Sequence, residues 1–167
     1  MTVMLWRLDA DDIAGALEIA RYAMTYDLTM PTGRRPTPYL LAEEVALSAQ
    51  RLLAAKQPVE LANLLDTIAL TERADMPDIV RAKLHKITGY VLRDANQLPE
   101  ALTHLQRAIQ LERTIGVKKD IEQLERQLRP KPEPAPKTKT TKPRTRKPAA
   151  KPAARRGRPP KAAKAAG

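Results

Sequence analysis

The chain has 167 residues and a mass of 18.6 kDa, which is enough for one ordinary domain and an appendage. It contains no cysteine, which excludes disulfides, thiolate metal sites and cysteine nucleophiles. It has no apolar run near the ~18 residues of a membrane span and no secretory signal pattern at its start, so we expect a basic, cytoplasmic protein without a membrane segment.

The net charge of +11 is concentrated at the C-terminal end. Residues 129–167 carry 14 lysines and arginines against one acid, whereas residues 1–128 have a net charge of −2. The C-terminal segment also lacks Leu, Ile, Val, Met and aromatic residues, so it cannot offset an ordering entropy of roughly 1–2 kcal/mol per residue. We therefore expect a folded domain over residues 1–128 and a disordered basic arm over residues 129–167.

At the start of the chain, residues 1–8 have the pattern of an interrupted helix. Only these eight residues precede an acidic turn at residues 9–12, and no capping residue stands before them. We expect either that the natural product extends further at its N-terminus or that a partner completes this helix. Leu5 and Trp6 would otherwise be exposed, which favours assembly into a homo-oligomer.

Five further segments carry apolar residues on one helical face, and none has the two-residue alternation of a strand. They lie within residues 38–55, 61–69, 80–91, 101–109 and 117–128. Thr37 followed by Pro38 predicts an N-cap with proline at the first helical position, and Gly116 predicts a left-handed C-terminal cap. The prediction is an all-α domain of about five to six helices.

An internal repeat relates residues 9–17 to residues 94–102, at an offset of 85 positions. Each copy is a short polar turn followed by Ala-Leu and by a small residue further along, which lets two antiparallel helices approach closely. The second copy resembles a tetratricopeptide helical hairpin, although the Trp and Tyr positions of that motif are not filled. A generic helical hairpin is the alternative interpretation.

The basic arm contains a segment that resembles an AT-hook. Its residues are Arg155, Arg156, Gly157, Arg158, Pro159 and Lys161. Glycine lets the backbone approach the floor of a narrow minor groove, and the arginines can lie along that groove, where A·T tracts concentrate negative potential. Arg144, Arg146 and Lys147 form a second basic cluster suited to phosphate contacts. The alternative is a charged tail that only keeps the protein soluble.

Few residues point to catalysis. His85 and His104 lie on different predicted helices, and we expect both at the helix surface. The acids of residues 9–12 suggest helix capping, because no glutamate follows at calcium-loop spacing. Asp78 with Lys83 faintly resembles a nuclease motif, but that motif needs a strand and this segment is predicted to be helical. We expect no metal site and no cofactor on this chain, with Mg²⁺ required only if DNA cleavage were intrinsic to it.

Five stretches resemble those of one known family: residues 1–9, 12–23, 74–78, 80–89 and 116–122. The family is the small terminase subunit of cohesive-end tailed bacteriophages, the M protein, also called the terminase endonuclease subunit. The resemblance extends over the whole chain, including the basic, proline-rich C-terminus. It implies a further N-terminal region before Met1.

The resemblance implies that the protein binds double-stranded viral DNA at the packaging (cos) site in the host cytoplasm. It also implies that the protein directs cleavage into cohesive ends and delivers the DNA to a large ATPase subunit. This chain has no phosphate-binding loop, so the ATPase would be a separate chain. Two other hypotheses remain open: a host nucleoid-associated adaptor with a histone-like tail, and a nuclease whose site includes a carboxylate such as Asp78 or Asp94.

Overall fold

The structure, a computed structural model, describes residues 2–30 and 35–129. Over these residues the chain forms seven α-helices and no strand, which confirms the all-α class and exceeds the expected number of helices by one. None of the seven is long and apolar enough to cross a bilayer. They are α1 (Thr2–Asp9), α2 (Ile13–Thr25), α3 (Thr37–Ala54), α4 (Leu61–Thr71), α5 (Asp78–Asp94), α6 (Leu98–Leu111) and α7 (Lys118–Leu128).

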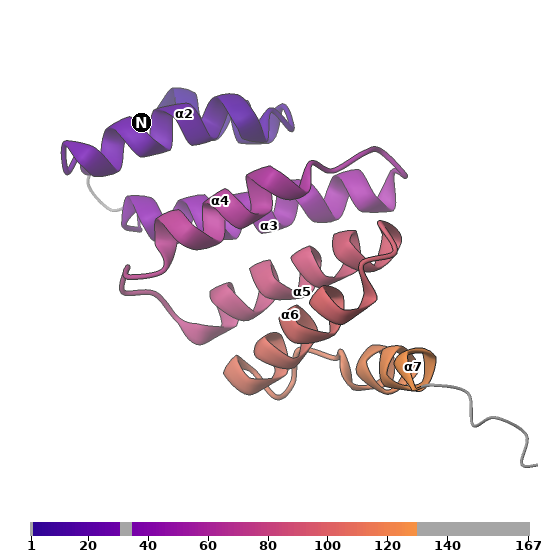
Figure 1. The fold of residues 1–167 in the computed structure, drawn as a ribbon. Helices are drawn as coiled ribbons and strands as arrows, with labels where there is room; N and C mark the ends of the chain where they lie inside the picture. The colour runs from indigo at the N-terminus through magenta and orange to yellow at the C-terminus, as the bar shows by residue number, and fades with distance from the viewer. Residues whose placement is uncertain (1, 31–34, 130–167) are drawn as a thin grey trace, which may run out of the picture. The chain divides into compact units, whose positions relative to one another are not determined.

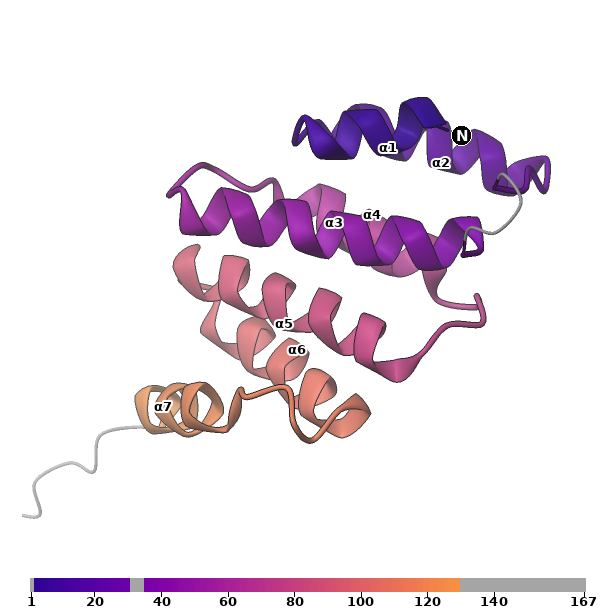
Figure 2. The same ribbon diagram turned by 180° about the vertical axis from the view of Figure 1, so that it is seen from behind.

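Each helix packs against the next one in sequence, and α3 is the central element (Figures 1 and 2). It contacts α1, α2, α4 and α5, so it has neighbours on most of its circumference. Its buried residues include Ala42, Ala46 and Ala49, whose small side chains let the surrounding helices come close. Because the chain has no phenylalanine, this core is built from close helix contacts and aliphatic side chains.

A second, smaller core joins α5, α6 and α7. Its buried residues are Leu92, Ala101, Leu105, Val117 and Leu124. Tyr90 and Leu61 are partly buried and pack against both cores. The basic arm predicted for residues 129–167 follows directly after α7, and beyond Arg129 it lies outside the described residues.

Four helices are each followed, two residues after their last residue, by a residue other than glycine in the left-handed conformation. These residues are Asp11, Asp27, Lys56 and Asn96, with φ between 49° and 61°. In each turn the following amide bonds back to the carbonyl five residues earlier, as in Asp12 N–H to Arg7 C=O at 2.8 Å and Gln97 N–H to Leu92 C=O at 2.9 Å. Asp11 and Asn96 are equivalent positions of the sequence repeat, so the repeat encodes the same turn twice. The shared turn does not establish the expected resemblance to a tetratricopeptide hairpin.

Two predicted caps are wrong. α3 begins at Thr37 with Pro36 as its N-cap, and the Thr37 hydroxyl donates instead to the Leu28 carbonyl at 3.1 Å. This bond ties the start of α3 to the segment that follows α2. Gly116 is left-handed, with φ of 82°, but α6 already ends at Leu111, so the glycine shapes the α6–α7 link rather than capping a helix.

Gly89 marks the closest approach of α5 to α6. A Cβ atom at this position would lie 2.7 Å from Cδ2 of Leu105 and 3.3 Å from the carbonyl oxygen of Ala101. Leu105 is itself buried in the second core and has no open space to move into. The absence of a side chain at this position therefore allows the hairpin to close.

We predict that Gly89→Ala destabilises the protein. Overpacking against Leu105 costs about 1–3 kcal/mol, while alanine gains about 1 kcal/mol over glycine as a helix former, so the net loss reaches up to about 2 kcal/mol. Urea unfolding followed by circular dichroism measures it. Gln123→Ala, at an exposed position of α7, is the control and should shift the free energy of unfolding by less than about 0.5 kcal/mol. A Gly89→Ala protein that is more stable than wild type would contradict the close approach.

Candidate functional site

The residues predicted to contact DNA lie outside the described residues. They are Arg144, Arg146, Lys147, Arg155, Arg156, Gly157, Arg158, Pro159 and Lys161. Their role stays a prediction, and the geometry that follows is that of the helical body, residues 2–30 and 35–129.

Asp12 is the N-cap of α2. Its Oδ1 accepts the Gly15 N–H at 2.9 Å, and its Oδ2 pairs with the Arg7 guanidinium. The bond from Gly15 and then the bond from Arg7 lower the pKa of the Asp12 carboxyl. Both carboxylate oxygens are engaged in holding the α1–α2 turn, which confirms the predicted capping role.

Asp11 links the same turn to α3. Its Oδ1 accepts the Ser48 hydroxyl at 2.8 Å and Nη2 of Arg51 at 2.9 Å, and Arg51 also donates to the Leu8 carbonyl at 3.0 Å. These bonds, led by the one from Ser48, lower the pKa of Asp11. The acids of this turn are therefore structural, and no group of three metal-ligating side chains occurs among the described residues.

His85 and His104 meet between α5 and α6, contrary to the expected separate positions on the helix surface. Their Nδ1 atoms are 3.0 Å apart, so one neutral ring donates its proton to the other. Burial, followed by His104, Arg107 and Arg81, lowers the pKa of His85 to about 4, and burial also lowers the pKa of His104. His85 precedes the α5–α6 turn by about as many residues as His104 follows it. Residues placed in this way lie opposite each other in a helical hairpin, so this spacing was the sequence signal that could have paired them.

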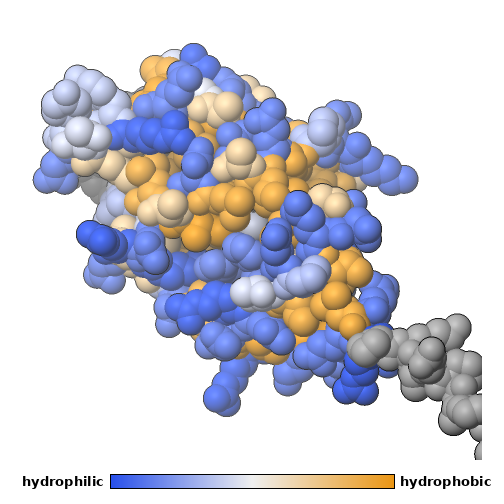
Figure 3. Space-filling view, in the orientation of Figure 1, coloured by the Kyte–Doolittle hydropathy of each residue, from blue (hydrophilic) through white to orange (hydrophobic). Residues whose placement is uncertain are grey.

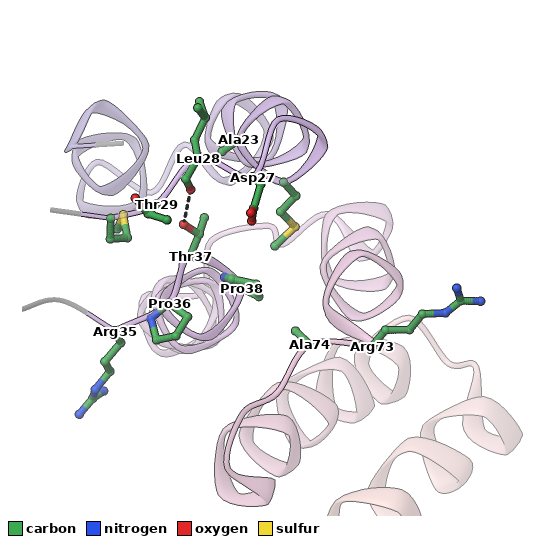
Figure 4. A pocket seen from close by; sticks show the side chains of 12 residues that line it. Ala23, Asp27, Leu28, Thr29, Arg35, Pro36, Thr37, Pro38, Arg73 and Ala74 are labelled. Atoms are coloured by element: carbon green, nitrogen blue, oxygen red, sulfur yellow. Dashed lines mark hydrogen bonds between the residues drawn. The ribbon is translucent and has the colours of Figure 1, made fainter. Parts of the chain in front are cut away.

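A hollow of about 560 Å³ lies where the end of α2, the start of α3 and the α4–α5 turn converge (Figure 4). The Thr37–Leu28 hydrogen bond crosses it, and the side chains of Arg35 and Arg73 point away from it. Arg35 is instead paired with Glu43. The described lining residues include no His, Lys, Ser or Cys, and the Thr37 hydroxyl is already bonded to the Leu28 carbonyl. We therefore assign no catalytic role to these residues.

A second hollow, of about 570 Å³, is the groove between α3 and α5, which lie side by side in Figure 2. We call it the α3–α5 groove. Its apolar lining comes from Ala46, Leu47, Leu53, Ala54, Ile87 and Ile115, and its basic lining from Lys83, Lys86 and Arg93 of α5. The 3-4-3 spacing of Lys83, Lys86, Tyr90 and Arg93 places them on one helical face. This basic helical face was not among the candidate sites predicted from the sequence.

Two of the three cations of the α3–α5 groove are oriented by the α6–α7 link and by α7. Lys86 Nζ donates to the Ile115 carbonyl at 2.9 Å, and Arg93 Nη1 lies 3.4 Å from Oδ1 of Asp120. Tyr90 lies beneath both, with the Arg93 guanidinium 4.9 Å and the Lys86 ammonium 5.9 Å from its ring centre. Burial and the neighbouring Asp120 raise the pKa of the Tyr90 hydroxyl to about 12, so it donates to that carboxylate at 3.2 Å.

Apolar side chains are also exposed elsewhere on the body. Figure 3 shows hydrophobic residues gathered over α4, where Leu65 is 42% exposed. On the first hairpin, Trp6 is 64% exposed as expected, whereas Leu5 is partly buried. Tyr22 and Tyr26, which are 60% and 62% exposed, have ring centres 4.5 Å apart. The exposed aromatic side chains of α1 and α2 are the surface on which the expected homo-oligomer would form.

The histidine pair predicts a loss of stability in mild acid. In the unfolded chain each histidine titrates near pH 6.5, but the folded pKa of His85 is about 4 and that of His104 is also lowered. Between these values the unfolded state binds more protons, so the free energy of unfolding falls as the pH falls through this window.

Urea unfolding at pH 7.5 and pH 4.5, for wild type and for His85→Gln, measures this effect. The free energy of unfolding should fall less in the variant between pH 7.5 and pH 4.5, because the variant lacks the His85 imidazole. The carboxylates that titrate in the same range are common to both proteins and contribute equally. An equal fall in the free energy of unfolding of the two proteins would show that protonation of His85 does not cause it.

The comparisons with known proteins agree with one another. A family model described as the phage small terminase subunit matches residues 1–79, which span α1 to α4 and the start of α5. The chain is 60% identical over 164 residues to the terminase endonuclease subunit of Escherichia phage P2, a match that covers 98% of this chain and 66% of that relative. The chain thus spans just under two thirds of the relative's length, and no solved structure matches it. On this evidence the chain belongs to the phage small terminase subunit family.

Proposed function

We propose that this chain is the DNA-binding and assembly subunit of a phage terminase. It binds double-stranded viral DNA at the packaging (cos) site, directs cleavage of that DNA and hands it to a large ATPase subunit in the bacterial cytoplasm. The observation that carries the proposal is the 60% identity, over 98% of the chain, to a terminase endonuclease subunit. Because the chain spans 66% of that relative, the activity of the longer protein is itself part of the proposal.

The distribution of charge assigns DNA binding to the arm. Residues 129–167 carry a net charge of +13, whereas the preceding 128 residues carry −2 and would be weakly repelled by phosphate. We assign general phosphate contacts to the cluster at residues 144–147 and minor-groove contacts to the Arg-Gly-Arg-Pro segment at residues 155–161. The helical body then serves to hold the protein partners.

We assign cleavage to the assembled terminase. Asp78, the carboxylate of the nuclease-like pattern, lies in the first turn of α5, where a negative charge stabilises the positive end of the helix. Lys83 is more than one helical turn further along and lines the α3–α5 groove. The two residues therefore have separate roles. Mg²⁺-dependent nicking by the purified chain that Asp78→Asn abolishes would instead support an intrinsic nuclease.

The host nucleoid-adaptor hypothesis is distinguished by its partners. A packaging subunit binds the large ATPase subunit of the same phage and prefers a duplex that contains the packaging site. A nucleoid adaptor binds unrelated duplexes equally well and decorates the host chromosome. The family of the chain favours packaging.

We predict that truncation after Arg129 removes most of the DNA affinity and its salt dependence. For the full chain, log K against log salt concentration should fall with a slope of about −0.9 per phosphate contact. The truncated chain should show a slope close to zero, measured by fluorescence anisotropy with a labelled duplex. Circular dichroism verifies that the helices are intact. Unchanged affinity of the truncated chain would show that the arm is not the contact surface.

We predict that two double substitutions of equal charge change have different effects. Arg156→Ala with Arg158→Ala removes the arginines that flank Gly157, so it should abolish any preference for A·T-rich over G·C-rich duplexes as well as weaken binding. Arg144→Ala with Arg146→Ala should weaken binding to both duplexes alike, since phosphate contacts carry no sequence information. Equal behaviour of the two variants would exclude minor-groove docking by residues 155–161.

A further inference from the structure

The α3–α5 groove has a charge opposite to that of the body in which it lies. Residues 1–128 have a net charge of −2, yet the lining of the groove holds three cations, Lys83, Lys86 and Arg93, against one acid, Asp94. All three cations come from one face of α5. This local excess of positive charge lies within the described helices and is independent of the basic arm.

The floor of the groove is apolar and partly open to solvent. Leu47 of α3 is 37% exposed, although its neighbours Ala46 and Ser48 are buried. Together with Leu53, Ile87 and Ile115 it lines a recess of about 570 Å³, which has room for apolar side chains of another molecule. Burying this floor would release water from apolar surface.

Two of the three cations on the rim, Lys86 and Arg93, are held in place and retain donors. Lys86 uses one of its three N–H donors on the Ile115 carbonyl, and Arg93 contacts Asp94 and Asp120 only at 3.3–3.4 Å. Lys83 lines the groove on the same face of α5. Ammonium and guanidinium groups that are already oriented lose less entropy on meeting a carboxylate.

An apolar floor beside a basic rim matches a peptide that carries apolar and acidic side chains together. A DNA backbone would satisfy the cations but would leave the apolar floor against charged phosphates. An amphipathic acidic segment satisfies both, with apolar side chains in the recess and carboxylates on the rim. The combination therefore favours a protein partner over nucleic acid.

We propose that the α3–α5 groove is the docking site for an acidic, amphipathic segment of the large ATPase subunit. This inference rests on the proposed function, which supplies the partner. It adds the surface and the chemistry of the contact: apolar anchors packed on Leu47 and Ile87, and carboxylates paired with Lys83, Lys86 and Arg93. The groove and the arm then bind different macromolecules.

The test measures affinity of the full chain for the purified large subunit of the same phage by isothermal titration calorimetry. Lys83→Glu alters the rim and Leu47→Asp alters the floor. Each has a matched control at an exposed position outside the groove: Lys119→Glu on α7 and Leu65→Asp on α4. We expect each groove variant to weaken binding about tenfold or more, and each control to stay within about twofold of wild type. Affinity for a labelled duplex should be unchanged in all four.

The outcomes separate the two proposals. If wild type binds the large subunit and both groove variants bind equally well, the groove is not the docking site while the proposed function stands. If the groove variants lose DNA affinity instead, the surface serves nucleic acid and the docking proposal is overturned. If wild type does not bind the large subunit at all, the partnership itself fails, and the docking proposal fails with it. If circular dichroism shows that Leu47→Asp does not fold, the comparison of Lys83→Glu with Lys119→Glu in affinity for the large subunit decides the docking proposal.

Discussion

Close packing around α3 is the constraint on which the rest of the body depends. Four helices contact α3, and alanines at positions 42, 46 and 49 keep its buried side narrow enough for them to do so. The strip of α3 that these neighbours leave open carries Leu47 and becomes one wall of the α3–α5 groove. The position of that groove is thus a consequence of how the core closes, and a bulkier residue in the alanine row would displace α5 together with its cations.

Helical periodicity predicted α3 to α7, because each of these segments repeats its apolar residues with the helical period. The interrupted helix at residues 1–8 and the repeat at residues 9–17 indicated α1 and α2. Contacts between elements were not predictable in the same way. His85 and His104 meet because their helices form a hairpin, and the Thr37 hydroxyl bonds to Leu28 because the chain folds back there. The helical face with Lys83 and Arg93 could be derived from spacing. The apolar side chains opposite it come from α3, where Leu47 stands 36 positions before Lys83 in sequence.

The body and the arm differ in the chemistry that they offer to partners. The arm carries dense positive charge without Leu, Ile, Val, Met or aromatic side chains, which suits a uniformly charged polyanion. The α3–α5 groove combines three cations with an apolar floor, which suits a folded or folding peptide. These two surfaces share no residue, so the proposed contacts to DNA and to protein use different side chains.

The bond from Lys86 to the Ile115 carbonyl helps to hold α7 against the rest of the body. α7 is the last helix of the described residues, so a force applied at their C-terminal end reaches α7 first. The attachments that resist such a force are the buried Val117 and Leu124, together with the polar contacts of Ile115 and Asp120 to α5. A change that loosens α7 would therefore also disturb Lys86 and Arg93, the two groove cations that these contacts orient.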